Sequence, residues 1–248
     1  MNIFNILFFK PILNLLIFCY NVFPIKDIGF SIIIVTFFIK ILIFPLSLMA
    51  KRYQEKMALL QPKVDALQKK IKEAKNPEEQ KKTYQEFLNL YKEEKINPLS
   101  SILPTILQFV ILITLFLVVN NFFISKDIAK DLYPWVGNPL EINFKFLNTI
   151  DLAKPNVFLA VLAAIFQFFQ TKLSLPKIAG KKDDIINIFN FQILYIFPLL
   201  TFFVLLKLRS IFGLYWLTMS ILSIFEEKYL FPRFIKANKT YGKKPTEN

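Results

Sequence analysis

Five apolar runs, each long enough to cross a bilayer as a helix, follow one another along the chain. They occupy residues 28–50, 102–124, 156–175, 187–206 and 211–231. About twenty apolar residues are enough for a helix to cross the hydrocarbon core. Only Lys207 to Ser210 separate the last two runs, which favours an antiparallel helical pair. The pattern therefore predicts an all-α integral membrane protein with five transmembrane helices and a core over residues 28–232.

A further apolar stretch at the start of the chain has a polar face. In residues 3–23, Lys10, Asn14 and Asn21 lie on one side of a helix that is otherwise rich in Phe, Ile and Leu. This pattern is typical of a helix in the membrane interface. The stretch is also apolar enough to span, so both readings stay open. We favour an N-terminal interfacial amphipathic helix over residues 1–25.

The segment between the first two runs predicts a helical hairpin. Apolar residues recur at helical spacing over 60–71 and again over 84–91. Between them, Asn76-Pro77-Glu78-Glu79 combines a capping residue, a proline and two acids, which indicates the start of a second helix. We expect an antiparallel hairpin over residues 51–96. The alternative is a solvated charged linker, which would leave the paired apolar stripes unexplained.

The basic residues predict the orientation. The chain has a net charge of +13, and 22 of its 31 Lys and Arg lie in 51–98, 172–186 and the part after 225. The other loops hold eight. Because basic loops stay in the cytoplasm, we expect a multi-pass protein with the N-terminus outside and a cytoplasmic C-terminus. Residues 233–248 would form a basic cytoplasmic tail.

Composition argues against conventional enzyme chemistry. The chain has no histidine, one cysteine and five glycines. Zinc sites, Ser-His-Asp triads and glycine-rich phosphate loops lack their parts. We therefore expect no catalytic residue, no cofactor and no metal, and we predict that the protein is not an enzyme.

Lys40 lies near the middle of the first run and is its one charged residue. At 1.5 Å per residue it is roughly 16 Å from Lys51, beyond the ~6 Å that a lysine stem can reach toward water. A cation at that depth costs a few kcal/mol. We therefore expect Lys40 to face a wet cavity. The alternative is a lysine paired with a polar group inside the helix bundle.

Uncharged polar residues of the other runs could share this cavity with Lys40, although each could also serve interhelical hydrogen bonding. The strongest candidates are Thr36, Gln108, Gln170, Tyr215 and Trp216, and the others include Gln167, Thr171, Tyr195, Thr201, Thr218, Ser220 and Ser223. The acids that come nearest to a membrane core are Glu226 and Glu227, at the inner edge of the fifth run. We therefore expect Lys40 to have no acidic partner at its own depth.

Four stretches together resemble a known family. They are IIIVTFFIKILIFPLSLMAKRYQEKMALLQPKVDALQKKI, YKEEKINPLSSILPTILQF, LAAIFQFFQTKLSLP and IFGLYWLTMSILSIFEE. In this order they resemble the YidC-type membrane protein insertases (the YidC/Oxa/Alb family), over about residues 11–232. The most specific pieces are the IFPLS–LQPK segment, NPL–LP–LQ and GLYWLT. The chain resembles the short form, without a large extracytoplasmic domain.

The resemblance implies five core helices around a hydrophilic groove that opens to the cytoplasm and to lipid. It also implies an interfacial helix before the first span, a cytoplasmic helical hairpin and a bacterial-type inner (cell) membrane. The family's groove carries a basic residue, usually arginine, at the position of Lys40. The other implied groove residues are Thr36, Gln108, Gln170, Tyr215 and Trp216.

The function implied is that of an insertase or chaperone for nascent membrane proteins. Lys40 would attract acidic residues of an incoming segment while the apolar part of that segment enters lipid. The expected partners are nascent membrane proteins, the ribosome and anionic lipids, with a Sec-type translocon as a further candidate. The tail would contact ribosomal RNA or lipid through Arg233, Lys236, Lys239, Lys243 and Lys244. The alternative function is a small-solute or ion transporter that uses Lys40 as a counter-ion.

Overall fold

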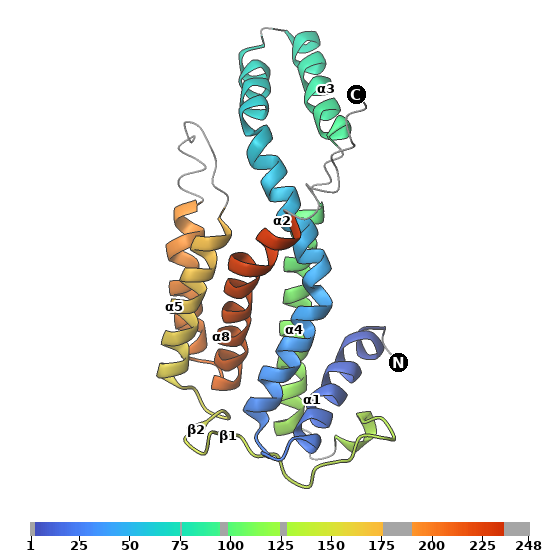
Figure 1. The fold of residues 1–248 in the computed structure, drawn as a ribbon, viewed down its shortest axis with the longest axis vertical. Helices are drawn as coiled ribbons and strands as arrows, with labels where there is room; N and C mark the ends of the chain where they lie inside the picture. Colours follow the sequence, from blue (N-terminus) through green and yellow to red (C-terminus); the bar gives the residue numbers. More distant parts are fainter. Residues whose placement is uncertain (1–2, 75, 95–98, 125–127, 176–189, 236–248) are drawn as a thin grey trace, which may run out of the picture.

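Helices make up almost all of the regular structure in the computed structural model of the protein (Figure 1). The structure describes residues 3–74, 76–94, 99–124, 128–175 and 190–235. The helices are α1 (Lys10–Val22), α2 (Ile28–Glu73), α3 (Pro77–Glu93), α4 (Leu99–Ile124), α5 (Val157–Ser174), α7 (Phe197–Leu205) and α8 (Ser210–Phe225). Short π-helical turns are η1 (Asn5–Phe9), η3 (Gln192–Ile196) and η4 (Glu226–Leu230), and η2 (Ala129–Asp131) is a 3₁₀ turn.

The longest helix, α2, is 46 residues long and runs almost the full height of the molecule (Figure 1). At 1.5 Å per residue it is roughly 70 Å long, more than twice the ~30 Å of a hydrocarbon core. The first apolar run and the first arm of the expected hairpin are therefore one continuous helix. Its apolar half lies inside the helix bundle and its charged half projects beyond it.

The projecting half of α2 packs against α3 (Figure 1). The Oδ1 atom of Asn76 accepts a hydrogen bond from the Glu79 backbone N–H at 2.8 Å, which caps α3 where the sequence indicates a helix start. Across the pair, Lys56 lies 3.2 Å from Glu94. The two arms therefore lie side by side, and the cytoplasmic location of this hairpin stays a prediction.

Among the residues that the structure describes, four helices are long and apolar enough to cross a membrane. They are Asn5–Val22, Ile28–Glu73, Leu103–Phe123 and Val157–Ser174, and the apolar helix Gln192–Leu205 is shorter. Large apolar side chains such as Leu42 and Phe203 point outward from the helices, 78% and 56% exposed. An apolar outer surface of this kind suits lipid rather than water. The chain is thus an all-α multi-pass membrane protein.

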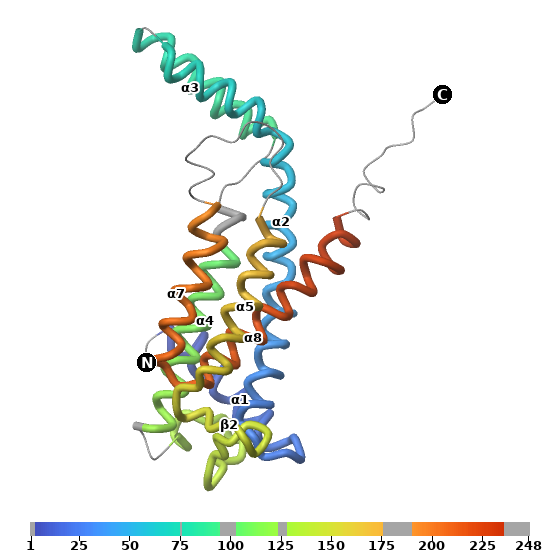
Figure 2. The backbone as a smooth tube through the Cα atoms, turned by 90° about the vertical axis from the view of Figure 1, so that its left-hand side faces the viewer, coloured from blue at the N-terminus to red at the C-terminus, as the bar shows by residue number. Residues whose placement is uncertain are grey.

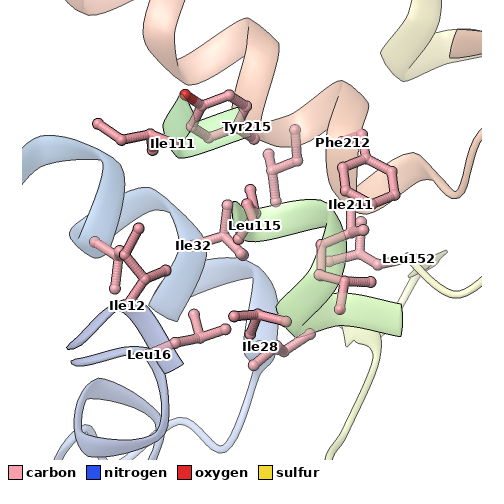
Figure 3. Close-up of a cluster of buried hydrophobic side chains, with 14 of the residues drawn as sticks. Ile12, Leu16, Ile28, Ile32, Ile111, Leu115, Leu152, Ile211, Phe212 and Tyr215 are labelled. Atoms are coloured by element: carbon pink, nitrogen blue, oxygen red, sulfur yellow. The ribbon is translucent and has the colours of Figure 1, made fainter. Parts of the chain in front are cut away.

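A cluster of buried hydrophobic side chains joins the helices (Figure 3). There, buried side chains of α1, α2, α4 and α8 meet, together with Leu152 from the segment before α5. Ile28, Leu152 and Ile211 are fully buried. This packing fixes the beginnings of α2 and α8 next to each other, so both helices run in the same direction from the same end.

Residues 128–155, here called the loop cap, close that end of the bundle. They contain η2 and the antiparallel pair β1 (Lys145–Phe146) and β2 (Ile150–Asp151). Asp27 begins α2 by accepting hydrogen bonds from Gly29 N at 2.7 Å and Leu147 N at 2.9 Å. A Cβ atom at Gly29 would collide with the Phe146 ring, so glycine permits this close packing. Ser210 ties α8 to the same segment through the Asp151 carbonyl at 3.1 Å.

The polar face of α1 also contacts the loop cap. Asn14 is 1% exposed; its amide donates to the Asp131 carbonyl at 3.0 Å and its Oδ1 accepts from Tyr133 N at 2.6 Å. Lys10 lies 3.6 Å from Asp131, and Asn21 donates to the Gly137 carbonyl at 2.6 Å. The face that suggested an interfacial helix therefore binds protein. The interfacial location of residues 1–25 stays a prediction.

The other end of the bundle is where α8 passes into η4 and a helical segment over 231–235 (Figure 2). Beyond α8 the chain turns toward α2, and Phe231 and Phe234 pack around Phe44 with ring centroids 5.9 and 5.4 Å away. The π-helical turn η4 and Pro232, two residues after it, let the backbone change direction here. Glu226 and Glu227 lie at this turn, facing α2.

We predict that Asn14→Leu destabilises the protein. The substitution leaves the Tyr133 N–H and the Asp131 carbonyl without their buried partner, a cost of about 1–3 kcal/mol. The apparent Tm of the purified protein in detergent should fall by about 3–8 °C. Asn21→Ala removes a solvent-exposed hydrogen bond of the same kind and should shift the Tm much less. Equal Tm values for the two variants would contradict the structural role given to Asn14.

Candidate functional site

A polar pocket lies between α2, α4, α5 and the end of α8. Its volume is about 220 Å³. The described residues that line it are Lys40, Ser47, Ala50, Lys51, Gln54, Pro104, Thr105, Gln108, Gln170, Ser174, Ser223, Glu226, Glu227 and Phe231. Charged, amide and hydroxyl side chains thus form most of a wall inside an otherwise apolar bundle, which is costly unless they bond to one another or to water.

Lys40 forms a short ion pair in this pocket. Its Nζ atom lies 2.6 Å from Glu226 Oε2, and the two side chains are 10% and 8% exposed. The expectation that Lys40 has no acidic partner at its own depth is therefore wrong. The alternative reading, a lysine paired inside the bundle, describes this contact correctly.

The depths of the two residues explain the contact. Because α2 and α8 begin at the same end, Lys40 lies twelve residues, or roughly 18 Å, along α2, and Glu226 sixteen residues, or roughly 24 Å, along α8. The remaining difference of about 6 Å is the length of a lysine stem. The distance between Lys40 and Lys51 along α2 does not reveal that Lys40 and Glu226 lie at similar depths.

A second ion pair lies beside the first. Lys51 Nζ is 2.6 Å from Glu227 Oε2, with side chains 16% and 10% exposed. Lys40 and Lys51 are eleven residues apart, about three helical turns, and so lie on one face of α2. Neighbouring carboxylates at the end of α8 thus bind two lysines from successive parts of α2. The charges of the described residues that line the pocket cancel.

Three of the six groove residues expected from the sequence meet in the pocket. Lys40 comes from α2, Gln108 from α4 and Gln170 from α5. Their amides and the neighbouring hydroxyls of Thr105 and Ser223 offer hydrogen bonds beside the charges. Sequence reasoning missed Lys51 as a pocket residue and the pairing role of Glu226 and Glu227. The signal that could have found them is that Lys40 and Lys51 lie on one face of a helix and that two consecutive acids lie at the end of the last apolar run.

The other three expected groove residues lie elsewhere. Thr36 is 1% exposed and donates to the Ile32 carbonyl of its own helix at 2.6 Å. Tyr215 is buried in the core near Ile111 (Figure 3). Trp216 donates from Nε1 to Gln167 Oε1 at 3.0 Å and so joins α8 to α5. These residues contribute to packing around the pocket rather than to its wall.

Trp216 also borders an apolar cavity of about 430 Å³. Side chains of α4 and α7 form its two sides, among them Phe109, Ile113, Leu200 and Val204. Gln108 faces the polar pocket while Phe109, the next residue, faces this apolar cavity. Helix α4 therefore separates a polar space from an apolar one at the same depth.

Of the five basic residues expected to form the tail site, the structure describes only the first, Arg233. Arg233 lies exposed on the helical segment that follows η4. Lys236, Lys239, Lys243 and Lys244 lie outside the described residues. Within the described ranges, no three His, Cys, Asp or Glu side chains are grouped so that they could hold a metal ion.

Comparison with known proteins gives consistent matches over most of the chain. A family model described as the 60Kd inner membrane protein matches residues 18–237. Membrane protein insertase YidC 2 of Listeria innocua is 30% identical over 198 residues, 79% of this chain and 61% of that protein. Membrane protein insertase YidC of Clostridium tetani is 31% identical over 195 residues, 79% of this chain and 77% of that protein.

Membrane protein insertase MisCB of Bacillus subtilis is a further relative, 29% identical over 201 residues, 77% of this chain and 67% of that protein. The chain spans about 61% of the length of the Listeria relatives that it matches.

We predict that breaking the Lys40–Glu226 pair costs more than removing it entirely. Lys40→Met and Glu226→Leu each leave one buried charge without its partner, which should destabilise the protein by about 3 kcal/mol. The double variant, with both charges removed, should recover most of this loss. Apparent Tm values of the four proteins in detergent measure the difference.

The exposed pair Lys69–Glu73 on the projecting half of α2 is the matched control. Its side chains are 75% and 65% exposed, and the same double replacement there should show no measurable coupling. Additive effects of Lys40→Met and Glu226→Leu would contradict a coupled buried pair.

Proposed function

We propose that this chain, which belongs to the 60Kd inner membrane protein family, acts as a membrane protein insertase and chaperone for nascent chains. The observation that supports the proposal most directly is the polar pocket around Lys40 within an apolar helix bundle. The names of the relatives favour the same activity over solute transport. We assign no catalytic residue and no cofactor to it.

In this proposal five helices cross the membrane and surround a groove. They correspond to the apolar half of α2, α4, α5, the segment that includes α7, and α8. The loop cap would lie outside and the hairpin of α2 and α3 in the cytoplasm of a bacterial-type cell, as the excess of Lys and Arg at the hairpin end favours. The polar pocket would be the inner part of a hydrated groove. The loop cap supports a groove that is closed toward the outside.

The proposed task is to shorten the apolar path of a hydrophilic segment. Unaided, such a segment would cross ~30 Å of hydrocarbon with unpaired backbone and side-chain polar groups, at several kcal/mol each. The pocket offers a cation, carboxylates, amides and hydroxyls part of the way across. Transfer of the client's apolar segment into lipid supplies the driving force, roughly 25 cal/mol per Å² of buried apolar surface. No nucleotide is needed for this step.

In the proposed insertion route, helix α4 would separate the polar pocket from the apolar cavity. Gln108 lines the polar pocket and Phe109 the apolar cavity between α4 and α7. A hydrophilic client segment would therefore sit on one side of α4 while apolar client side chains contact the other helices or lipid.

The expected partners remain nascent membrane proteins, the ribosome, anionic lipids and a Sec-type translocon. Arg233 and the four lysines after it would bind ribosomal RNA or lipid through charge.

We predict that water reaches Gln108 but not Phe109. In a Cys19→Ser background, a cysteine at position 108 in inside-out membrane vesicles should react with a charged, membrane-impermeant maleimide. A cysteine at position 109, at the same depth on α4, should react slowly, because an apolar environment suppresses thiolate formation. These two cysteine substitutions leave the Lys40–Glu226 contact intact. Equal protection of both cysteines would contradict a hydrated groove.

We predict that the groove contacts nascent membrane proteins. A photo-crosslinking residue at position 108 should form adducts with a ribosome-stalled membrane protein and far fewer with a stalled soluble chain. The same residue at Leu42, which is 78% exposed on the outer surface of α2, serves as the control. Adducts with neither chain, combined with Lys40-dependent uptake of a solute into vesicles, would favour the transporter instead.

A further inference from the structure

The Lys40–Glu226 pair changes what the pocket can select. The described residues that line the pocket include two lysines, Lys40 and Lys51, and two acids, Glu226 and Glu227. Each lysine lies 2.6 Å from one acid. An unpaired cation would attract an incoming carboxylate over many ångströms, whereas a paired one presents mainly a dipole, whose attraction weakens faster with distance. The resting pocket therefore has little preference for the sign of a client charge.

We propose that Glu226 is a specificity-determining residue that lets the site accept client segments of either charge by partner exchange. This inference rests on the insertase function proposed above. An acidic client residue replaces Glu226 at Lys40, and a basic client residue replaces Lys40 at Glu226. Both exchanges substitute one carboxylate–ammonium pair for another, so the number of ion pairs is conserved and the displaced side chain keeps its charge within the pocket. The displaced side chain is left facing the amides and hydroxyls of the pocket.

The surroundings of the pair suit such an exchange. Gln108 and Gln170, from α4 and α5, line the same space and can donate to a carboxylate or accept from an ammonium. Lys51 and Glu227 form a second pair in the pocket wall and can bind whichever side chain is displaced. Among the described residues that line the pocket, these are the charged groups that face the pair.

The test compares three clients that differ at one position. Full-length protein is reconstituted in liposomes, and a single-span client is synthesised with Asp, Asn or Lys in its short translocated segment. Protection of that segment from added protease measures insertion. For the wild-type protein we expect the Asp and Lys clients to insert to within about twofold of each other, because both exchanges conserve the number of ion pairs.

The variants then shift this ratio in opposite directions. Glu226→Gln keeps the size and a hydrogen-bond acceptor but removes the charge, so the Asp-to-Lys ratio should rise roughly tenfold. Lys40→Gln should lower the ratio. The exchanged pair Lys40→Glu with Glu226→Lys restores both charges and should return the ratio toward the wild-type value. Recovery also shows that the fold tolerates changes at both positions.

Glu141→Gln is the matched control, because Glu141 is exposed in the loop cap, outside the pocket, and its replacement removes one carboxylate there. It should leave the ratio unchanged. A ratio that is unaffected by Glu226→Gln while Lys40→Gln alters it would overturn the role of Glu226 and leave the insertase function standing. Failure of the wild-type protein to insert any of the three clients would overturn the proposed function, and this inference with it.

Discussion

The structure depends on neutralising a charge that the first long helix carries into the apolar bundle. A lone ammonium at that depth would be expensive, and Glu226 lies 2.6 Å from Lys40, so that neither charge is buried without a partner. The pair requires α2 and α8 to run side by side and in the same direction. It also requires the end of α8 to turn toward α2. Much of the geometry of the polar pocket follows from satisfying this one contact.

The two ends of the bundle use polar groups in different ways. At the loop-cap end, Asn14, Tyr20 and Asp27 bind backbone groups of residues 128–155, and these hydrogen bonds hold the helix starts together. At the other end, polar side chains surround an open space, and the ion pairs Lys40–Glu226 and Lys51–Glu227 join side chain to side chain. The first arrangement suits a fixed closure, and the second suits a site that exchanges its partners. This asymmetry fits the proposed insertion route, which would be closed on one side.

The positions of several helices could be predicted from local sequence, because the length of an apolar run and the presence of capping residues are properties of neighbouring residues. Apolar runs of bilayer length predict α2, α4 and α5, and Asn76-Pro77 predicts the start of α3. Polar residues within apolar runs also predict part of the site, because Lys40, Gln108 and Gln170 meet in one pocket. Tyr215 and Trp216 were expected in the same place, but the rotation of α8 about its axis turns them toward the core and toward Gln167. Helical rotation depends on packing partners that no single segment specifies.

The sequence by itself determined that this is an all-α membrane protein with a cation at membrane depth, because hydrophobicity and helix length are properties of contiguous residues. Only the tertiary structure decided that Glu226 neutralises that cation and that the loop cap covers the polar face of α1. These contacts join residues 186 and 119 positions apart. Such pairs follow from the relative depth and direction of packed helices, which emerge only when the whole bundle assembles.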